Sequence, residues 1–176
     1  MQRLLVTAAV LLASASVFAQ TPYAGMQTRA VKALSEQQVS DLTAGRGMGL
    51  ALAAELNGYP GPSHVLELAD QLELSANQRD RIKALFESMK AEAQPLGSKL
   101  IAQETELDRL FATHSISPAT LKASTVAIAV TQGELRETHL KYHLSTADIL
   151  NASQLLRYAE LRGYAGDSDY QMHHHH

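Results

Sequence analysis

The sequence contains no cysteine and no tryptophan, and aromatic residues make up only 5% of its 176 residues. Without cysteine an exported chain has no disulfides, so side-chain packing alone must hold it together. Alanine and leucine dominate instead, which favours closely packed helices over a β-sandwich. The formal net charge of −3 provides no electrostatic footprint for nucleic acid, which is therefore excluded as a partner.

Motifs typical of enzymes are also missing. There is no Gly-x-Ser-x-Gly elbow and no P-loop, and the two histidines at 139 and 143 have no glutamate between them to make a His-Glu-x-x-His zinc motif. No strand is predicted before the glycine-rich segment 45–49, so it does not fit a dinucleotide-binding loop. We interpret it as a place where helices approach closely, and we expect a protein that is not an enzyme.

The first 19 residues have the organisation of a secretory signal peptide. Arg3 supplies a positive charge, residues 4–12 are apolar apart from one threonine, and Ala19 offers a small residue for cleavage. The apolar run is shorter than the roughly 20 residues of a membrane span, although a retained N-terminal anchor is the alternative. We expect export to the periplasm as a soluble protein, with no membrane span after the leader is removed.

After this leader, the sequence predicts a mobile lead-in (20–34), a single all-α domain (35–164) and a disordered tail (165–176) that ends in four histidines. Within the domain, Ser35 to Gln38 is a capping box that starts a short helix, which is expected to end near Gly45.

Two more short helices are expected before the long ones. Residues 50–56 continue as helix, and a Tyr-Pro-Gly-Pro loop at 59–62 follows. Ser63 is predicted to cap the next helix, whose apolar residues recur with the spacing of one helical face.

Two similar five-residue motifs then mark further helix starts. Leu-Ser-Ala-Asn-Gln at 74–78 and Leu-Asn-Ala-Ser-Gln at 150–154 are both capping boxes. The chain between them is long enough for two long helices that turn at 114–118. The apolar stripe of the first holds through Pro95, which predicts a kink rather than an end.

The second long helix has a less apolar stripe than the first, so we expect the pair to bury a face in a second copy of the chain. Its predicted buried residues are Leu121, Thr125, Ile128, Gln132, Leu135, His139, Tyr142, Thr146 and Ile149. A short last helix carries Leu155, Leu156, Tyr158 and Leu161. The predicted fold is an all-α, bent helical hairpin of two long helices with short flanking helices, assembled as a homodimer.

The histidines indicate a metal site. His139 and His143 stand four residues apart on one helical face, a spacing that lets two imidazoles bind one ion, although such pairs also line solvated edges. With the turn near 112–118, His64, Glu87 and Met89 fall at the same level along the bundle axis. Imidazole with a carboxylate or thioether suits zinc, copper, nickel or cobalt. The terminal His173, His174, His175 and His176 are either a native metal-binding tail or the remnant of a purification tag.

The doubled phrase at 74–78 and 150–154 resembles the LTxxQ motif of periplasmic Spy/CpxP-type proteins, which include stress chaperones, zinc-resistance-associated proteins and heavy-metal sensors. The resemblance covers about residues 63–164, and both copies lack the threonine. It implies a bent four-helix hairpin, usually dimeric. In the metal-sensing branch, a His-x3-His and a His-x3-Met supply ligands. Here the first becomes His64-x3-Leu68, without its second ligand, and the second becomes His139-x3-His143.

Two functions follow from the residues and this resemblance. The first is a periplasmic metal-binding protein in heavy-metal resistance or sensing, or in the envelope stress response. The alternative is a metal-independent Spy/CpxP-type chaperone or stress-signalling adaptor, whose partners are unfolded proteins or a membrane signalling protein. A structural helical protein without a small ligand is a third interpretation.

Overall fold

The computed structural model describes residues 23–164. The predicted signal peptide (1–19) and His173–His176 lie outside the described residues. Every regular element within the described range is a helix, which confirms the all-α prediction. The elements are η1 (Met26–Thr28), α1 (Glu36–Ala44), α2 (Leu52–Glu55), α3 (Pro62–Glu67), α4 (Ala76–Ala112), α5 (Pro118–Ala147) and α6 (Ala152–Leu161). None of these helices is long and apolar enough to cross a membrane.

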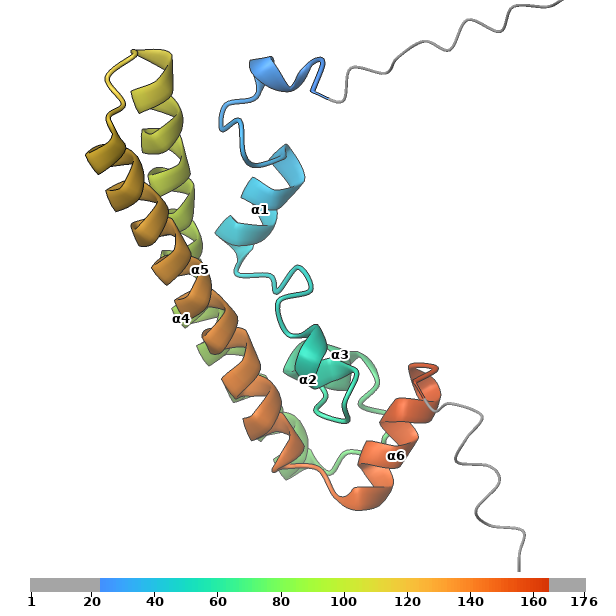
Figure 1. Cartoon of the computed structure of the whole chain (residues 1–176). Helices are drawn as coiled ribbons and strands as arrows, with labels where there is room; N and C mark the ends of the chain where they lie inside the picture. The colour runs from blue at the N-terminus through green and yellow to red at the C-terminus, as the bar shows by residue number, and fades with distance from the viewer. Residues whose placement is uncertain (1–22, 165–176) are drawn as a thin grey trace, which may run out of the picture.

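The two long helices, α4 and α5, pack side by side as the predicted hairpin (Figure 1). Ser75 caps α4 by accepting a hydrogen bond from the backbone N–H of Gln78, and Ser117 caps α5 in the same way. Pro118 occupies the first turn of α5, where the missing N–H costs nothing. Because α4 continues through Pro95, the prediction that this proline does not end the helix is confirmed.

The buried face of α5 differs from the predicted stripe. Leu121, Thr125 and Gln132 are exposed, whereas Thr131 and Thr138 are buried. The prediction did not include contacts from the shorter helices, but α2 and α3 also contact α5. The covered face is therefore wider toward the end of α5 and narrower toward the hairpin turn.

Helix α1 lies alongside α4 because one glycine permits a close approach. A Cβ atom on Gly97 would lie 2.2 Å from the backbone oxygen of Leu42 on α1, so no other residue fits there without movement of the helix. Leu42, Leu100 and Leu135 meet in the core cluster that joins α1 to the hairpin. This contact holds the segment after α1 over the middle of the two long helices (Figure 1).

A second core cluster lies at the opposite end of the hairpin from its turn. It joins α3, the start of α4 and α6 through Val65, Ala69, Leu72, Leu74, Ile82, Leu150 and Tyr158. One prediction was wrong here. Gly61, not Ser63, is the N-cap of α3, because Pro62 fits the first helical position.

The two capping boxes are joined through their glutamines. Gln78 and Gln154 each accept a hydrogen bond from the backbone N–H of their own cap residue, at 3.0 Å in both cases. Their side-chain amides also contact each other, with Gln78 Nε2 2.8 Å from Gln154 Oε1 and Gln154 Nε2 3.1 Å from Gln78 Oε1. We call this pair the glutamine clasp; it ties the start of α4 to the start of α6.

The clasp explains why both motifs end in glutamine. The amide of Gln78 also donates to the carbonyl oxygen of Ile149, and that of Gln154 donates to the carbonyl oxygen of Leu72. A glutamate could cap its own helix equally well, but its ionised carboxylate has no hydrogen to donate across the pair. The doubled motif is thus a tertiary contact as well as two local helix starts.

Candidate functional site

Four of the five internal residues predicted as metal ligands line one cavity of about 260 Å³. They are His64 on α3, Met89 on α4, and His139 and His143 on α5. The fifth, Glu87, does not line it. Its side chain is 59% exposed and lies 3.6 Å from Lys90, one turn along α4. The predicted level along the hairpin axis therefore agrees with the position of the cavity for four residues. The fifth, Glu87, does not line the cavity because the rotation of α4 turns its side chain to solvent.

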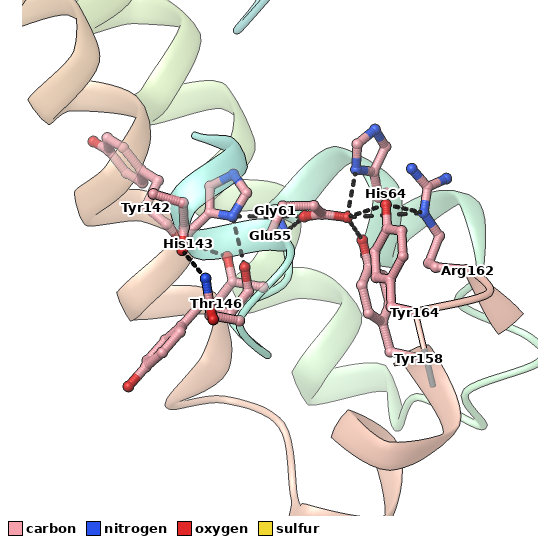
Figure 2. A network of polar contacts seen from close by, with 12 residues as sticks. Glu55, Gly61, His64, Tyr142, His143, Thr146, Tyr158, Arg162 and Tyr164 are labelled. Carbon is pink, nitrogen blue, oxygen red and sulfur yellow. Dashed lines mark hydrogen bonds and ion pairs between the residues drawn. The ribbon is translucent and has the colours of Figure 1, made fainter. Parts of the chain in front are cut away.

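The ring of His143 is oriented by the loop before α3 (Figure 2). Its Nδ1 lies 2.7 Å from the carbonyl oxygen of Tyr59. A carbonyl only accepts, so Nδ1 donates this hydrogen bond and Nε2 is the ring nitrogen left for another partner. A Cβ atom on Gly61 would lie 2.8 Å from Nε2, so glycine leaves that nitrogen its space. A backbone acceptor that sets the tautomer is the usual support of a metal-binding histidine.

His139 is more deeply buried than His143, at 2% exposure against 8%. Its Nε2 is buried and makes no hydrogen bond. Burial lowers the pKa of His139, and the neighbouring His143 lowers it further. The ring is therefore neutral at pH 7. A buried nitrogen without a partner costs on the order of 1–3 kcal/mol, and a metal ion would supply the partner that the protein does not.

Glu55, at the end of α2, is the central polar residue of the site, and the sequence analysis missed it. Its side chain is 6% exposed. Oε2 accepts the backbone N–H of Gly61 at 3.0 Å. Oε1 lies 3.3 Å from His64 Nδ1 and accepts a short hydrogen bond from the hydroxyl of Tyr158.

The end of α6 completes this network around Glu55 (Figure 2). The Tyr164 hydroxyl donates to Oε1 at 3.3 Å, and Arg162 Nε lies 3.8 Å from the same oxygen. Burial, followed by the hydrogen bond to Glu55, raises the pKa of Tyr158 well above its ordinary value. Tyr158 therefore stays protonated and donates to Glu55 at neutral pH.

A signal for Glu55 was present in the sequence. It is the only acidic or basic residue, histidine aside, in the segment 47–66, which is otherwise apolar, small or neutral. A single carboxylate in such a segment is rarely buried without partners. The partners, Tyr158, Arg162 and Tyr164, lie about a hundred residues away, and no local pattern connects them to Glu55.

The donor atoms share the cavity but do not converge on one point. Among residues 23–164, no group of three or more histidine, cysteine or acidic side chains is arranged to hold a metal ion. The arrangement offers the imidazoles of His64, His139 and His143 and the thioether of Met89, with Glu55 in contact with the ring of His64. These groups are of the kind that borderline or soft metal ions prefer.

A second, larger hollow of about 600 Å³ lies between α1 and the hairpin. Its apolar lining includes Leu34, Leu42, Leu50, Leu100 and Leu135. Asp41 and Arg136 also line it, and none of the predicted metal ligands does. It is therefore a separate surface with a chemistry suited to apolar side chains.

No protein-family model, curated protein or solved structure matches this chain. The resemblance to LTxxQ-motif proteins therefore rests on the residues at 74–78 and 150–154 and stays a prediction. The proposed function therefore rests on the residues that line the cavity.

Proposed function

We propose that this chain is a periplasmic metal-binding protein that serves heavy-metal resistance or sensing, or the envelope stress response. The observation that carries the proposal is that His64, Met89, His139 and His143 line the same cavity. Three different helices contribute these side chains. Residues chosen for their ligand chemistry and axial level thus line one cavity, and this shared position supports the proposal.

The donor chemistry supports zinc, copper, nickel or cobalt over hard ions such as magnesium. Imidazole nitrogen and thioether sulfur are borderline to soft ligands, whereas magnesium and calcium prefer oxygen. His143 uses Nδ1 for its hydrogen bond to Tyr59, which leaves Nε2 for another partner, and His139 Nε2 lacks a hydrogen-bond partner. Each ring therefore has one nitrogen that no hydrogen bond within the described residues occupies.

The proposal includes the cellular setting that the sequence predicts. The predicted signal peptide supports a periplasmic location, and the resemblance of the two motifs to LTxxQ supports a grouping with the Spy/CpxP-type proteins and a homodimer. A membrane signalling protein is the partner expected of a sensor. Oligomeric state by analytical ultracentrifugation and signal-peptide removal in a Gram-negative host test these parts separately.

The metal proposal is tested by titration calorimetry of zinc, copper, nickel and cobalt into the mature protein with His173–His176 replaced by alanine. We expect one submicromolar site per protomer or per dimer. His139→Asn with His143→Asn removes both imidazoles and should weaken binding by more than the roughly 10–100-fold that loss of an outer-shell partner costs. His114→Asn, in the hairpin turn, is the matched control and should bind as the parent does. Equal affinity of the double variant and the control would refute the proposal.

The metal-independent chaperone or adaptor is the second candidate, and the apolar hollow beside α1 favours it. Val126 and Val130 on α5 are also more than half exposed, so the hairpin offers apolar surface to an unfolded client. In this case the protein suppresses aggregation of a denatured client at near-equal molar ratio with metal chelated. Absence of suppression would count against the chaperone.

A further inference from the structure

The side of α5 opposite its buried residues is exposed and carries no charge over about three helical turns. No charged residue lies between Lys122 and Glu134, and within this run only Ile128 and Thr131 are buried. Apolar residues are spread almost evenly around the axis of α5, and a helix of this kind is usually covered on all sides. Residues 23–164 leave this side of α5 without a cover.

Four residues form the centre of this exposed side, which we call the α5 outer face. Val126 and Val130 are each more than half exposed, and the small Ala129 and Gly133 lie beside them, also exposed. At 3.6 residues per turn all four fall within an arc of about 100°. A Cβ atom on Gly133 would meet no atom within 4 Å. The face therefore offers protruding valines next to a gap, which is how packed helices interlock.

One charge of each sign borders the α5 outer face. Lys122 lies one turn before the four residues and Glu137 one turn after them. Both side chains are exposed, and neither forms an ion pair within the described part of the chain, whereas the nearby Glu134 and Lys141 do. The two borders are about 22 Å apart along the helix and carry opposite charges that no described residue neutralises.

This arrangement makes the α5 outer face complementary to itself. The midpoint between Lys122 and Glu137 is also the midpoint between Val126 and Gly133. Two copies of α5 that pack antiparallel about a two-fold axis at this point bring Lys122 of each copy to Glu137 of the other. The same axis brings Val126 of each copy to the gap at Gly133 of the other. A parallel pair would instead place Lys122 against Lys122.

We infer that the α5 outer face is the surface through which two copies of this chain associate, with their α5 helices antiparallel. The inference rests on the homodimer of the proposed function and adds its surface, its orientation and its contacts. A second copy is the occupant that the matched charges and the matched valine and gap indicate. One face of one helix lies at the small end of stable interfaces, which bury about 1,200 Å² or more, so we expect a dissociation constant on the order of micromolar.

The first experiment measures the dimer dissociation constant by analytical ultracentrifugation. It uses the mature chain with His173–His176 replaced by alanine and with metal chelated, so that histidines cannot join two copies through a metal ion. Gly133→Leu fills the gap and should weaken the dimer at least about tenfold. Its fold should be retained, because leucine favours a helix more than glycine does, and circular dichroism checks this. Ala84→Leu, at an exposed position of α4, is the matched control and should leave the dissociation constant unchanged.

The second experiment exchanges the border charges. Lys122→Glu and Glu137→Lys each turn two attractive pairs of the dimer into repulsive ones and should each weaken it by about tenfold. An equimolar mixture of the two single variants should regain the affinity of the parent, because a mixed antiparallel dimer restores an attractive pair at both borders. Lys83→Glu makes the same charge change on an exposed residue of α4 and is the control that should dimerise as the parent does.

The outcomes separate this inference from the function beneath it. A dimer that none of the α5 variants weakens overturns the inference and leaves a homodimer that forms through another surface. A mixture that associates no better than its two components overturns the antiparallel arrangement. A parent protein that stays monomeric at about 100 μM overturns both the inference and the homodimer, and the metal proposal is then decided by calorimetry alone. A weaker dimer in the three α5 variants, with recovery in the mixture and unchanged controls, supports the inference.

Discussion

The two ends of the α4–α5 hairpin are built from the same two helices but differ in what surrounds them (Figure 1). At the base, Ile82 is fully buried in the cluster that includes α3 and α6. At the tip, residues 109–125, Phe111 is 51% and Leu121 39% exposed. The polar contacts of the tip are local, such as Thr113 with Ser115 at 2.7 Å.

This difference shows that long helices alone do not make a functional site. At the tip, α4 and α5 pack against each other. At the base, the segments before and after the hairpin close around it, bury Glu55 and His139, and link residues as distant as Glu55 and Tyr164. We expect stability and ligand chemistry to depend on the base, and substitutions at the tip to have small effects.

The largest expected effect is on packing at the base. Ile82→Ala should lower the free energy of unfolding by about 2–5 kcal/mol, because it leaves a cavity in a fully enclosed site. Phe111→Ala at the tip removes a larger side chain that is half exposed, and should cost about 1 kcal/mol or less. Urea unfolding followed by circular dichroism measures both. A larger loss for Phe111→Ala would mean that the tip is covered in solution, as a homodimer would cover it.

The glutamine clasp should be the next most sensitive feature. Gln78→Ala and Gln154→Ala each lose a cap contact and amide hydrogen bonds between helices, and should each cost about 1–3 kcal/mol. The double variant should cost less than the sum, by about 0.5–3 kcal/mol, because the two amides contact each other.

Ser117→Ala is the corresponding cap change at the tip and should cost about 1 kcal/mol. It should combine additively with Gln154→Ala, since the sites share no partner. Additive losses from the two glutamine variants in a urea double-mutant cycle would disprove the clasp as a coupled unit.

The smallest expected effect is the pH dependence at His139. Burial lowers the pKa of His139 in the folded protein, so the unfolded chain takes up a proton at higher pH than the folded one. The contribution of the neutral His139 ring to the free energy of unfolding is therefore complete above its unfolded-state pKa of about 6.5, and it is lost as the pH falls below that pKa. When the pH is lowered from 7.5 to 5.5, the free energy of unfolding of the parent protein should fall by about 1 kcal/mol more than that of His139→Leu. Parallel profiles from urea unfolding at each pH would contradict this.

Features that depend on near neighbours in the chain were predicted well. The caps at Ser35, Ser75 and Asn151 are all present as capping boxes. In each case the donor and acceptor stand within three residues, so the pattern can be recognised in a single segment. Ser63 failed as a cap only because Pro62, one residue earlier, fits the first helical turn better.

The candidate site was predicted in part. The constant rise per residue of a helix and the position of the turn gave the axial level of His64, Met89, His139 and His143, all of which line the cavity. They could not give the rotation of α4 about its axis, so Glu87 was included among the predicted ligands although its side chain faces solvent. Glu55 was omitted, because its role depends on groups contributed by distant α6.

The sequence by itself determined the helical character, most of the helix starts and the position of His139 and His143 on one face of α5, because these depend on contacts within a few residues. Only the tertiary structure decided which faces turn inward, that the two glutamines meet, and that Glu55 joins the cavity to α6. These features depend on the packing of segments up to a hundred residues apart, and the rotation of each helix is set by all its neighbours together.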